Sequence, residues 1–153
     1  ILALMFIFMN PTILYYLPII KKVAIYNKVV EQNYFEFIQL LIKKEKLYLN
    51  LKLIINDVSN GVGISKTNIR ATILVNTEKN FNDYINLFRI EEAIKLIEAN
   101  YLTTHTVVAL GEKSGFNSHQ SFFRAFKKIH DTTPYLYLNS LNKKGVIRPR
   151  YPQ

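Results

Sequence analysis

The polar side chains between Ser118 and His130 are the ones that could do chemistry, and that chemistry is recognition of a polyanion. Arg124, Lys127 and Lys128 recur at helical spacing beside a stripe of phenylalanines. Arginine can bind guanine through two hydrogen bonds, glutamine can bind adenine, and lysine suits phosphate. The pattern predicts a helix capped by Ser118, with a packed aromatic face and a basic face that fits a DNA major groove.

The charge distribution points to the same part of the chain. The 153 residues carry a formal charge of +9, and residues 101–153 contribute +6 of it through eight basic and two acidic side chains. A basic region attracts nucleic acid and speeds the encounter with it. Charge alone supports equally well a basic surface that has no partner.

Motifs of enzymes and metal sites are missing from the sequence. The chain has no cysteine, which excludes disulfides, thiolate zinc sites and cysteine nucleophiles. His105, His119 and His130 lack the spacing of a helical metal pair, and no carboxylate cluster joins them. The turn at 61–63 lacks the lysine and hydroxyl of a phosphate-binding loop. We therefore expect no catalytic residue, no metal and no cofactor.

Seven stretches with helical periodicity would position the basic side chains. Between residues 34 and 141 no alternating pattern of a strand competes, so the expected fold class is all-α. The expected helices cover residues 34–48, 53–60, 65–75, 80–99, 106–113, 118–130 and 133–141. Asn80 is the expected cap of the helix over 80–99, and the residues expected on its inward face are Phe81, Ile85, Phe88, Ala93, Leu96 and Ile97. A short helix, a glycine turn and a serine-capped helix occur twice, about 53 residues apart, and the long helix 80–99 joins the two copies.

The N-terminal segment, residues 1–20, is apolar but interrupted by Pro11 and Pro18. A membrane-spanning helix needs about 20 apolar residues, so the segment is a poor complete span. It is a better match to the end of a transmembrane helix, with Tyr15 and Tyr16 at the membrane interface and Lys21 and Lys22 on the cytoplasmic side. A buried soluble helix and an apolar docking segment are the alternatives. Residues 21–33 are predicted to be a linker, and residues 142–153 a basic tail.

Two stretches resemble a known family, the DNA-binding domain of AraC-type (AraC/XylS) helix-turn-helix transcription regulators. GFNSHQSFFRAFKKIHDTTPYLYL, residues 115–138, is close to the family's signature of Gly-Phe, Ser, Phe, Arg-x-Phe-Lys-Lys and Thr-Pro. NFNDYINLFRIEEA, residues 80–93, resembles its linker-helix motif. MNPTILYYLP beside the apolar run resembles, more weakly, bacterial regulators in which a membrane sensor is fused to such a domain.

The resemblance implies a domain over residues 34–141 with two helix-turn-helix subdomains joined by a long linker helix. The first unit would cover 53–76, the linker helix 80–99 and the second unit 106–130. The recognition helices would enter successive major grooves on one face of the DNA. The implied DNA-binding residues are Lys66, Thr67, Arg70, Ser118, His119, Gln120, Ser121, Arg124, Lys127 and Lys128.

The function implied is sequence-specific DNA binding that regulates transcription, without chemistry on the DNA. The expected partners are double-stranded DNA, a membrane reached through the N-terminus, and a second copy of the chain in a homodimer. The expected location is a cytoplasmic DNA-binding domain tethered to the bacterial inner membrane. Two alternatives stay open: a protein-interaction module or decayed regulator with a degenerate first unit, and a membrane-attached protein whose basic tail holds lipid headgroups.

Several residues depart from the family pattern. In the first unit, Ser59 replaces a small alanine, Ala71 offers no base hydrogen bond, and Glu78 replaces a glycine. In the second, Asp131 replaces a glycine, and Gly111 replaces an alanine and should loosen its helix by about 1 kcal/mol. We infer that the second unit binds DNA more strongly, or that the first contributes mainly phosphate contacts.

Arg89 is the one arginine of the predicted linker helix, and acidic residues surround it. Asp83, Glu91 and Glu92 lie within six residues of it. We therefore expect Arg89 to be an intramolecular partner rather than a DNA ligand.

Overall fold

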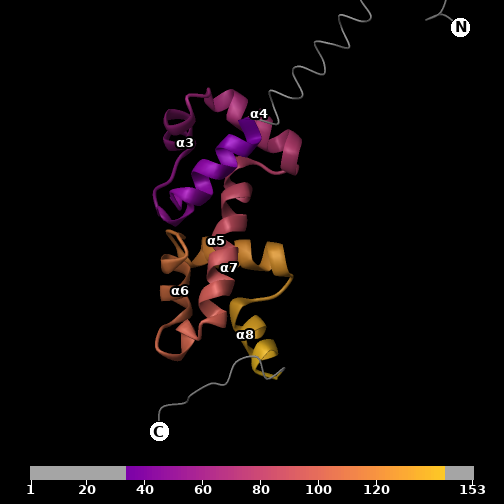
Figure 1. Ribbon diagram of the computed structural model, residues 1–153. Coiled ribbons are helices and arrows are strands. Elements are labelled where there is room, and N and C mark those ends of the chain that lie inside the picture. The colour runs from indigo at the N-terminus through magenta and orange to yellow at the C-terminus, as the bar shows by residue number, and fades with distance from the viewer. Residues whose placement is uncertain (1–33, 144–153) are drawn as a thin grey trace, which may run out of the picture.

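The computed structural model describes residues 34–143, with side chains for residues 34–141 (Figure 1). Every regular element in that range is helical, which confirms the all-α fold class. The elements in chain order are a helix over 34–44, η1 (Leu47–Leu49), α3 (Ile55–Val62), α4 (Lys66–Thr77), α5 (Phe81–Glu98), η2 (Tyr101–Thr103), α6 (Val107–Lys113), α7 (His119–His130) and α8 (Pro134–Lys143). The apolar segment 1–20, the linker 21–33 and most of the tail lie outside the described residues.

Capping side chains determine where three of these helices begin. Ser65, Asn80 and Ser118 each accept the backbone amide three residues further on through a side-chain oxygen, at 3.2, 2.9 and 3.2 Å. Such a bond satisfies one of the amides that a helix start leaves without a partner. The caps that the sequence predicts for α4, α5 and α7 are therefore confirmed.

Left-handed residues end the two serine-capped helices. Glu78 follows α4 with φ 57°, and Asp131 follows α7 with φ 53°. Glycine adopts this conformation without steric cost, whereas an L side chain costs roughly 1–2 kcal/mol. The first predicted helix is too long by four residues, because the chain leaves it after residue 44 and Lys46 turns left-handed at φ 47° before η1.

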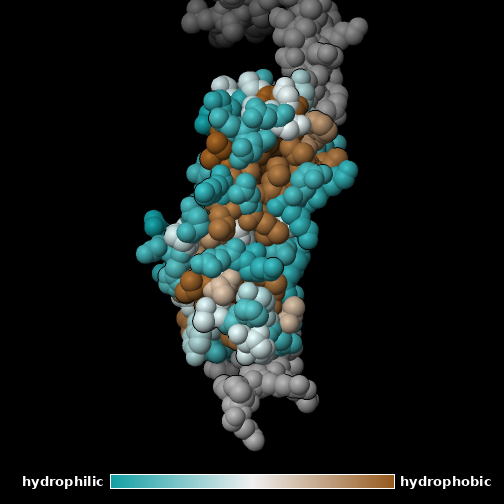
Figure 2. All heavy atoms as spheres, turned by 90° about the vertical axis from the view of Figure 1, so that its left-hand side faces the viewer, coloured by the Kyte–Doolittle hydropathy of each residue, from teal (hydrophilic) through white to brown (hydrophobic). Residues whose placement is uncertain are grey.

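Two clusters of buried apolar side chains lie on either side of the middle of α5. The first contains Ile38, Ile42, Val58, Ile69, Ile73 and the N-terminal half of α5. The second contains Leu110, Phe116, Phe122, Phe126 and the C-terminal half of α5. Figure 1 shows α5 running from the group formed by 34–44, α3 and α4 to the group formed by α6, α7 and α8. On the side of α3 and α6, some hydrophobic residues reach the surface among hydrophilic ones (Figure 2).

The buried residues of α5 agree with the predicted inward face except at three positions. Phe81, Ile85, Phe88, Ala93 and Ile97 are buried as expected. Leu96 is only half-buried, and Tyr84 and Ile90 are buried in addition. Because α5 contributes to two cores, it buries side chains around more of its circumference than a helix with a single apolar stripe does.

Among the described helices, none combines the length and the apolar character that crossing a bilayer requires. The predicted end of a transmembrane helix, residues 1–20, lies outside the described residues. Membrane attachment therefore stays a prediction.

Candidate nucleic-acid interface

Helix α7 has the two faces that its sequence predicts. Phe122 and Phe126 are fully buried, and their rings meet edge to face with centroids 5.8 Å apart. Five of the predicted contact residues are exposed on the other side: His119, Gln120, Arg124, Lys127 and Lys128. Phe123 is half-buried at the border, with its ring 4.1 Å from the imidazole of His119. The basic face is therefore available to a partner.

Ser118 and Ser121 have roles within the start of α7. The hydroxyl of Ser118 accepts the amide of Ser121 at 3.2 Å, and the hydroxyl of Ser121 donates to the carbonyl of Ser118 at 2.8 Å. Ser121 is also half-buried. These bonds fix the N-terminal turn of the helix, and DNA contact by either serine stays a prediction.

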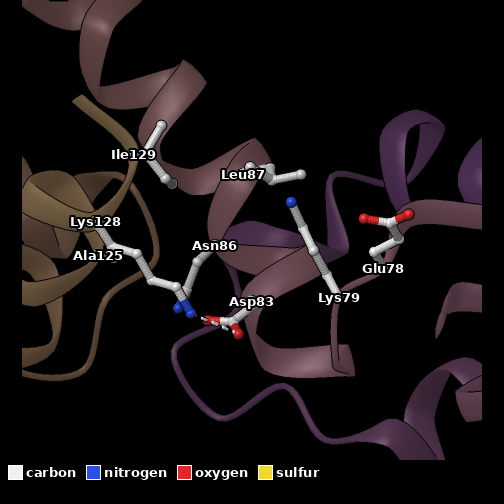
Figure 3. Close-up of a pocket in the computed structure, with 8 residues that line it drawn as sticks. All are labelled: Glu78, Lys79, Asp83, Asn86, Leu87, Ala125, Lys128 and Ile129. Atoms are coloured by element: carbon white, nitrogen blue, oxygen red, sulfur yellow. Dashed lines mark hydrogen bonds and ion pairs between the residues drawn. The ribbon is translucent and has the colours of Figure 1, made fainter. Parts of the chain in front are cut away.

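Lys127 and Lys128, both predicted from the sequence to bind DNA, differ in their surroundings. The ammonium of Lys128 lies 2.8 Å from a carboxylate oxygen of Asp83 on α5 (Figure 3). This pair lines a hollow of about 370 Å³ between α5 and α7, together with Leu87 and Ile129. The ammonium of Lys127 has no polar partner within residues 34–141. Lys127 is thus the freer of the two for a phosphate group.

Helix α4 places its three predicted contact residues outward. Lys66, Thr67 and Arg70 are exposed, while Ile69 and Ile73 on the opposite face are fully buried. The guanidinium of Arg70 makes no hydrogen bond or ion pair with the described residues. It lines an open hollow of about 490 Å³ with Ile54 and Leu74.

Ser59, which departs from the family pattern, has a local role in the first unit. Its hydroxyl donates to the carbonyl of Ile64 at 2.6 Å, across the turn that separates α3 from α4. A hydroxyl that tightens this turn replaces the apolar contact of an alanine. The turn itself also contains Gly63, which has φ 68° and ends α3.

The second half of α4 carries an exposed apolar surface that the sequence reasoning missed. Leu74 is 56% exposed and Val75 is 69% exposed. At the offset of the internal repeat, these positions correspond to Lys127 and Lys128 of α7. Helical periodicity could not reveal the difference, because an apolar residue is by default assigned to the core.

Arg89 connects the linker helix to the segment that precedes the first unit. Its Nε donates to the carbonyl of Tyr48 at 2.7 Å, and its Nη2 donates to the carbonyl of Asn50 at 3.0 Å. Its guanidinium also lies 5.6 Å from the ring centroid of Phe116, which belongs to the second unit. Burial lowers the pKa of this side chain.

The expectation that Arg89 has an intramolecular role is confirmed. It is an intramolecular partner, but backbone carbonyls and an aromatic ring bind it rather than neighbouring carboxylates. Glu91 pairs instead with Lys95 at 3.0 Å, and Asp83 pairs with Lys128. Arg89 thus contacts groups from both ends of the domain.

Two glycines permit close packing around the second unit. Gly115 has φ 93°, and a Cβ at this position would collide with the carbonyl oxygen of Tyr48. A Cβ on Gly111 would lie 3.0 Å from the ring of Phe122. The expectation that Gly111 only loosens its helix was therefore incomplete, because the missing methyl group lets α6 approach a buried ring of α7.

A family model described as "Helix-turn-helix domain" matches residues 58–140. The xylose operon regulatory proteins of Escherichia coli strains K12 and O157:H7 are each 29% identical over 83 residues, which is 54% of this chain and 20% of theirs. The chain thus matches about a fifth of the length of these relatives.

Two solved structures share the fold. The C-terminal domain of the two-component response regulator yesN from Fusobacterium nucleatum superposes with a TM-score of 0.58 and 25% identity, over 69% of this chain and 98% of that one. The C-terminal domain of AraT, a response regulator from Geobacillus stearothermophilus, gives a TM-score of 0.59 with 18% identity, over 81% of this chain and 91% of that one.

Proposed function

This chain belongs to the AraC-type helix-turn-helix family of DNA-binding transcription regulators, and we propose that it binds a specific duplex sequence by inserting α4 and α7 into successive major grooves. Each recognition helix would contact base edges with its exposed face, beginning at its N-terminal half, and lysines would contact the phosphates. The family is one of regulators, and the mechanism needs no reaction at the DNA.

The arrangement of α4 and α7 carries this proposal. Each is a helix of 12 residues with a serine cap, a buried apolar face and an exposed polar face. Both pack on α5, and Figure 1 shows them following one another along its axis. Two exposed recognition helices on one rigid helix are what a reader of two adjacent grooves requires.

The test begins with selection of random duplexes by the full chain, followed by titration of Arg124→Ala against the selected sequence. We expect a loss of about 1–3 kcal/mol in specific binding and relaxed sequence preference at one base pair. Lys95→Ala is the matched control, because Lys95 is an exposed cation on α5 whose partner is Glu91. Selection without a recurring motif, or equal affinity of Arg124→Ala and wild type, would contradict the proposal.

Salt dependence separates phosphate contacts from base contacts. Removing a cation that binds phosphate reduces the slope of log K against log salt by about 1. We expect this reduction for Lys127→Ala, because the ammonium of Lys127 has no polar partner among the described residues. A smaller reduction is expected for Lys128→Ala, since the ion pair with Asp83 competes with phosphate. Identical slopes for wild type and Lys127→Ala would rule out a phosphate contact there.

Membrane attachment and homodimerisation remain predictions of the sequence. The first depends on residues 1–20, which the structure does not describe. We infer only that a tether at the N-terminus would join the DNA-binding domain through the helix over 34–44. Flotation of the full chain with lipid vesicles, compared with residues 21–153, would test attachment, and sedimentation with and without the selected duplex would test dimer formation.

A further inference from the structure

We propose that the first recognition helix, α4, recognises the 5-methyl groups of thymine through Thr67, Ala71 and Leu74. This inference rests on the proposed function, because it requires α4 to lie in a major groove. In that groove α4 would bind a half-site with thymines at the positions that face these three residues. The second unit would read its half-site by other chemistry.

The three residues form one stripe on the outward face of α4. They are spaced four and three residues apart, which places them on the same side of a helix. All three are exposed, Leu74 with 56% of its surface. Lys66 and Arg70 lie along one border of the stripe and are also exposed. The stripe therefore presents methyl groups beside cations that can hold the flanking phosphates.

Thymine is the base that such a surface fits. Its 5-methyl group is the apolar feature of the major groove, and alanine and the methyl group of threonine are among its usual contacts. Neither Ala71 nor Leu74 has a polar side-chain atom that could bind a base edge or a phosphate. Their exposure thus argues against a first unit that contributes mainly phosphate contacts.

The internal repeat provides the contrast. Ala71, Leu74 and Val75 of α4 occupy the positions of Arg124, Lys127 and Lys128 in α7. Both helices start from a serine cap and both bury the opposite face, so the corresponding positions have the same direction relative to the core. The second unit therefore has hydrogen-bonding and charged groups where the first has methyl groups.

The experiment replaces single thymines of the selected duplex with deoxyuridine, which removes only the methyl group. The half-site of α7 is identified first, as the half in which Arg124→Ala relaxes specificity. In the other half, removing a methyl group that α4 contacts should lower the affinity about two- to fourfold. The same replacement in the half-site of α7 is the internal control and should change affinity less.

Variants of α4 assign the effect to the helix. Leu74→Ala shortens an exposed side chain without harming helix propensity, and it should abolish the difference between thymine and deoxyuridine at one position. Val75→Ala, at the edge of the stripe, should keep that difference. If no motif emerges from selection, the proposed function fails. If a motif emerges but its first half-site lacks thymine, or deoxyuridine binds as well as thymine, this inference alone is overturned.

Discussion

Replacing Arg89 should destabilise the domain more than replacing any other lysine or arginine of the described residues. The Nε bond to Tyr48 is partly buried, and a hydrogen bond from a charged donor contributes about 1.5–3 kcal/mol. The bond to Asn50 is exposed, so water can replace it at small cost. The contact with the ring of Phe116 adds about 0.5–1 kcal/mol. For Arg89→Met, which keeps the apolar stem, we expect a loss of about 2–4 kcal/mol.

Two further variants make the measurement specific. Arg89→Lys keeps the charge but loses the planar fork, so it should recover only part of the loss. Lys95→Met removes a cation from the same helix, but its pair with Glu91 is exposed on both sides, and such pairs contribute little. The measurement is the free energy of unfolding of the full chain in urea, followed by far-ultraviolet circular dichroism. If Arg89→Met and Lys95→Met lose equal stability, the hydrogen bonds of Arg89 to Tyr48 and Asn50 do not stabilise the domain as described.

Two other predictions concern the folded state. Glu78→Gly should raise the free energy of unfolding by about 0.5–1 kcal/mol, because relief of the left-handed strain exceeds the entropy cost of glycine. Asp131→Gly should raise it less, since aspartate tolerates this conformation better than glutamate does. Equal or absent gains in the urea midpoints of the two variants would refute the argument. Burial raises the pKa of Tyr84, against the lowering effect of the hydrogen bond from Gln39. The contribution of the protonated Tyr84 to the free energy of unfolding is therefore fully present below about pH 10, and it is lost as the pH rises through the pKa of Tyr84 in the folded state. Tyr84→Phe should therefore lessen the fall in unfolding free energy above about pH 10, with Tyr135→Phe at an exposed tyrosine as the control, and an unchanged fall would refute it.

Local signals made most of the helices predictable. A serine or asparagine before a periodic apolar stretch is a start signal that acts within four residues, and the caps at Ser65, Asn80 and Ser118 were predicted for that reason. The end of the first helix was missed because its apolar periodicity continues to Tyr48, whereas the chain turns at Lys46 and buries Tyr48 from a 3-10 turn.

Features that depend on distant parts of the chain were not predictable. The partners of Arg89 lie 41 and 39 residues away, and its acidic neighbours in sequence do not bind it. The ion pair of Lys128 with Asp83 joins residues 45 apart, so nothing near Lys128 distinguishes it from Lys127. The exposure of Leu74 depends on which face of α4 the core covers, and an apolar residue at the border of that face fits either side.

The contacts of Tyr48 have a consequence for the architecture of an operator. Its carbonyl oxygen accepts a hydrogen bond from Arg89 of the linker helix. The same oxygen lies so close to Gly115 of the second unit that a Cβ there would collide with it. Both contacts would have to break before the two units could move relative to each other. Each base pair inserted between two half-sites rotates one of them by roughly a tenth of a helical turn. If α4 and α7 read two half-sites as proposed, those half-sites would share one centre-to-centre spacing, and a single inserted base pair would move the second half-site out of phase with α7.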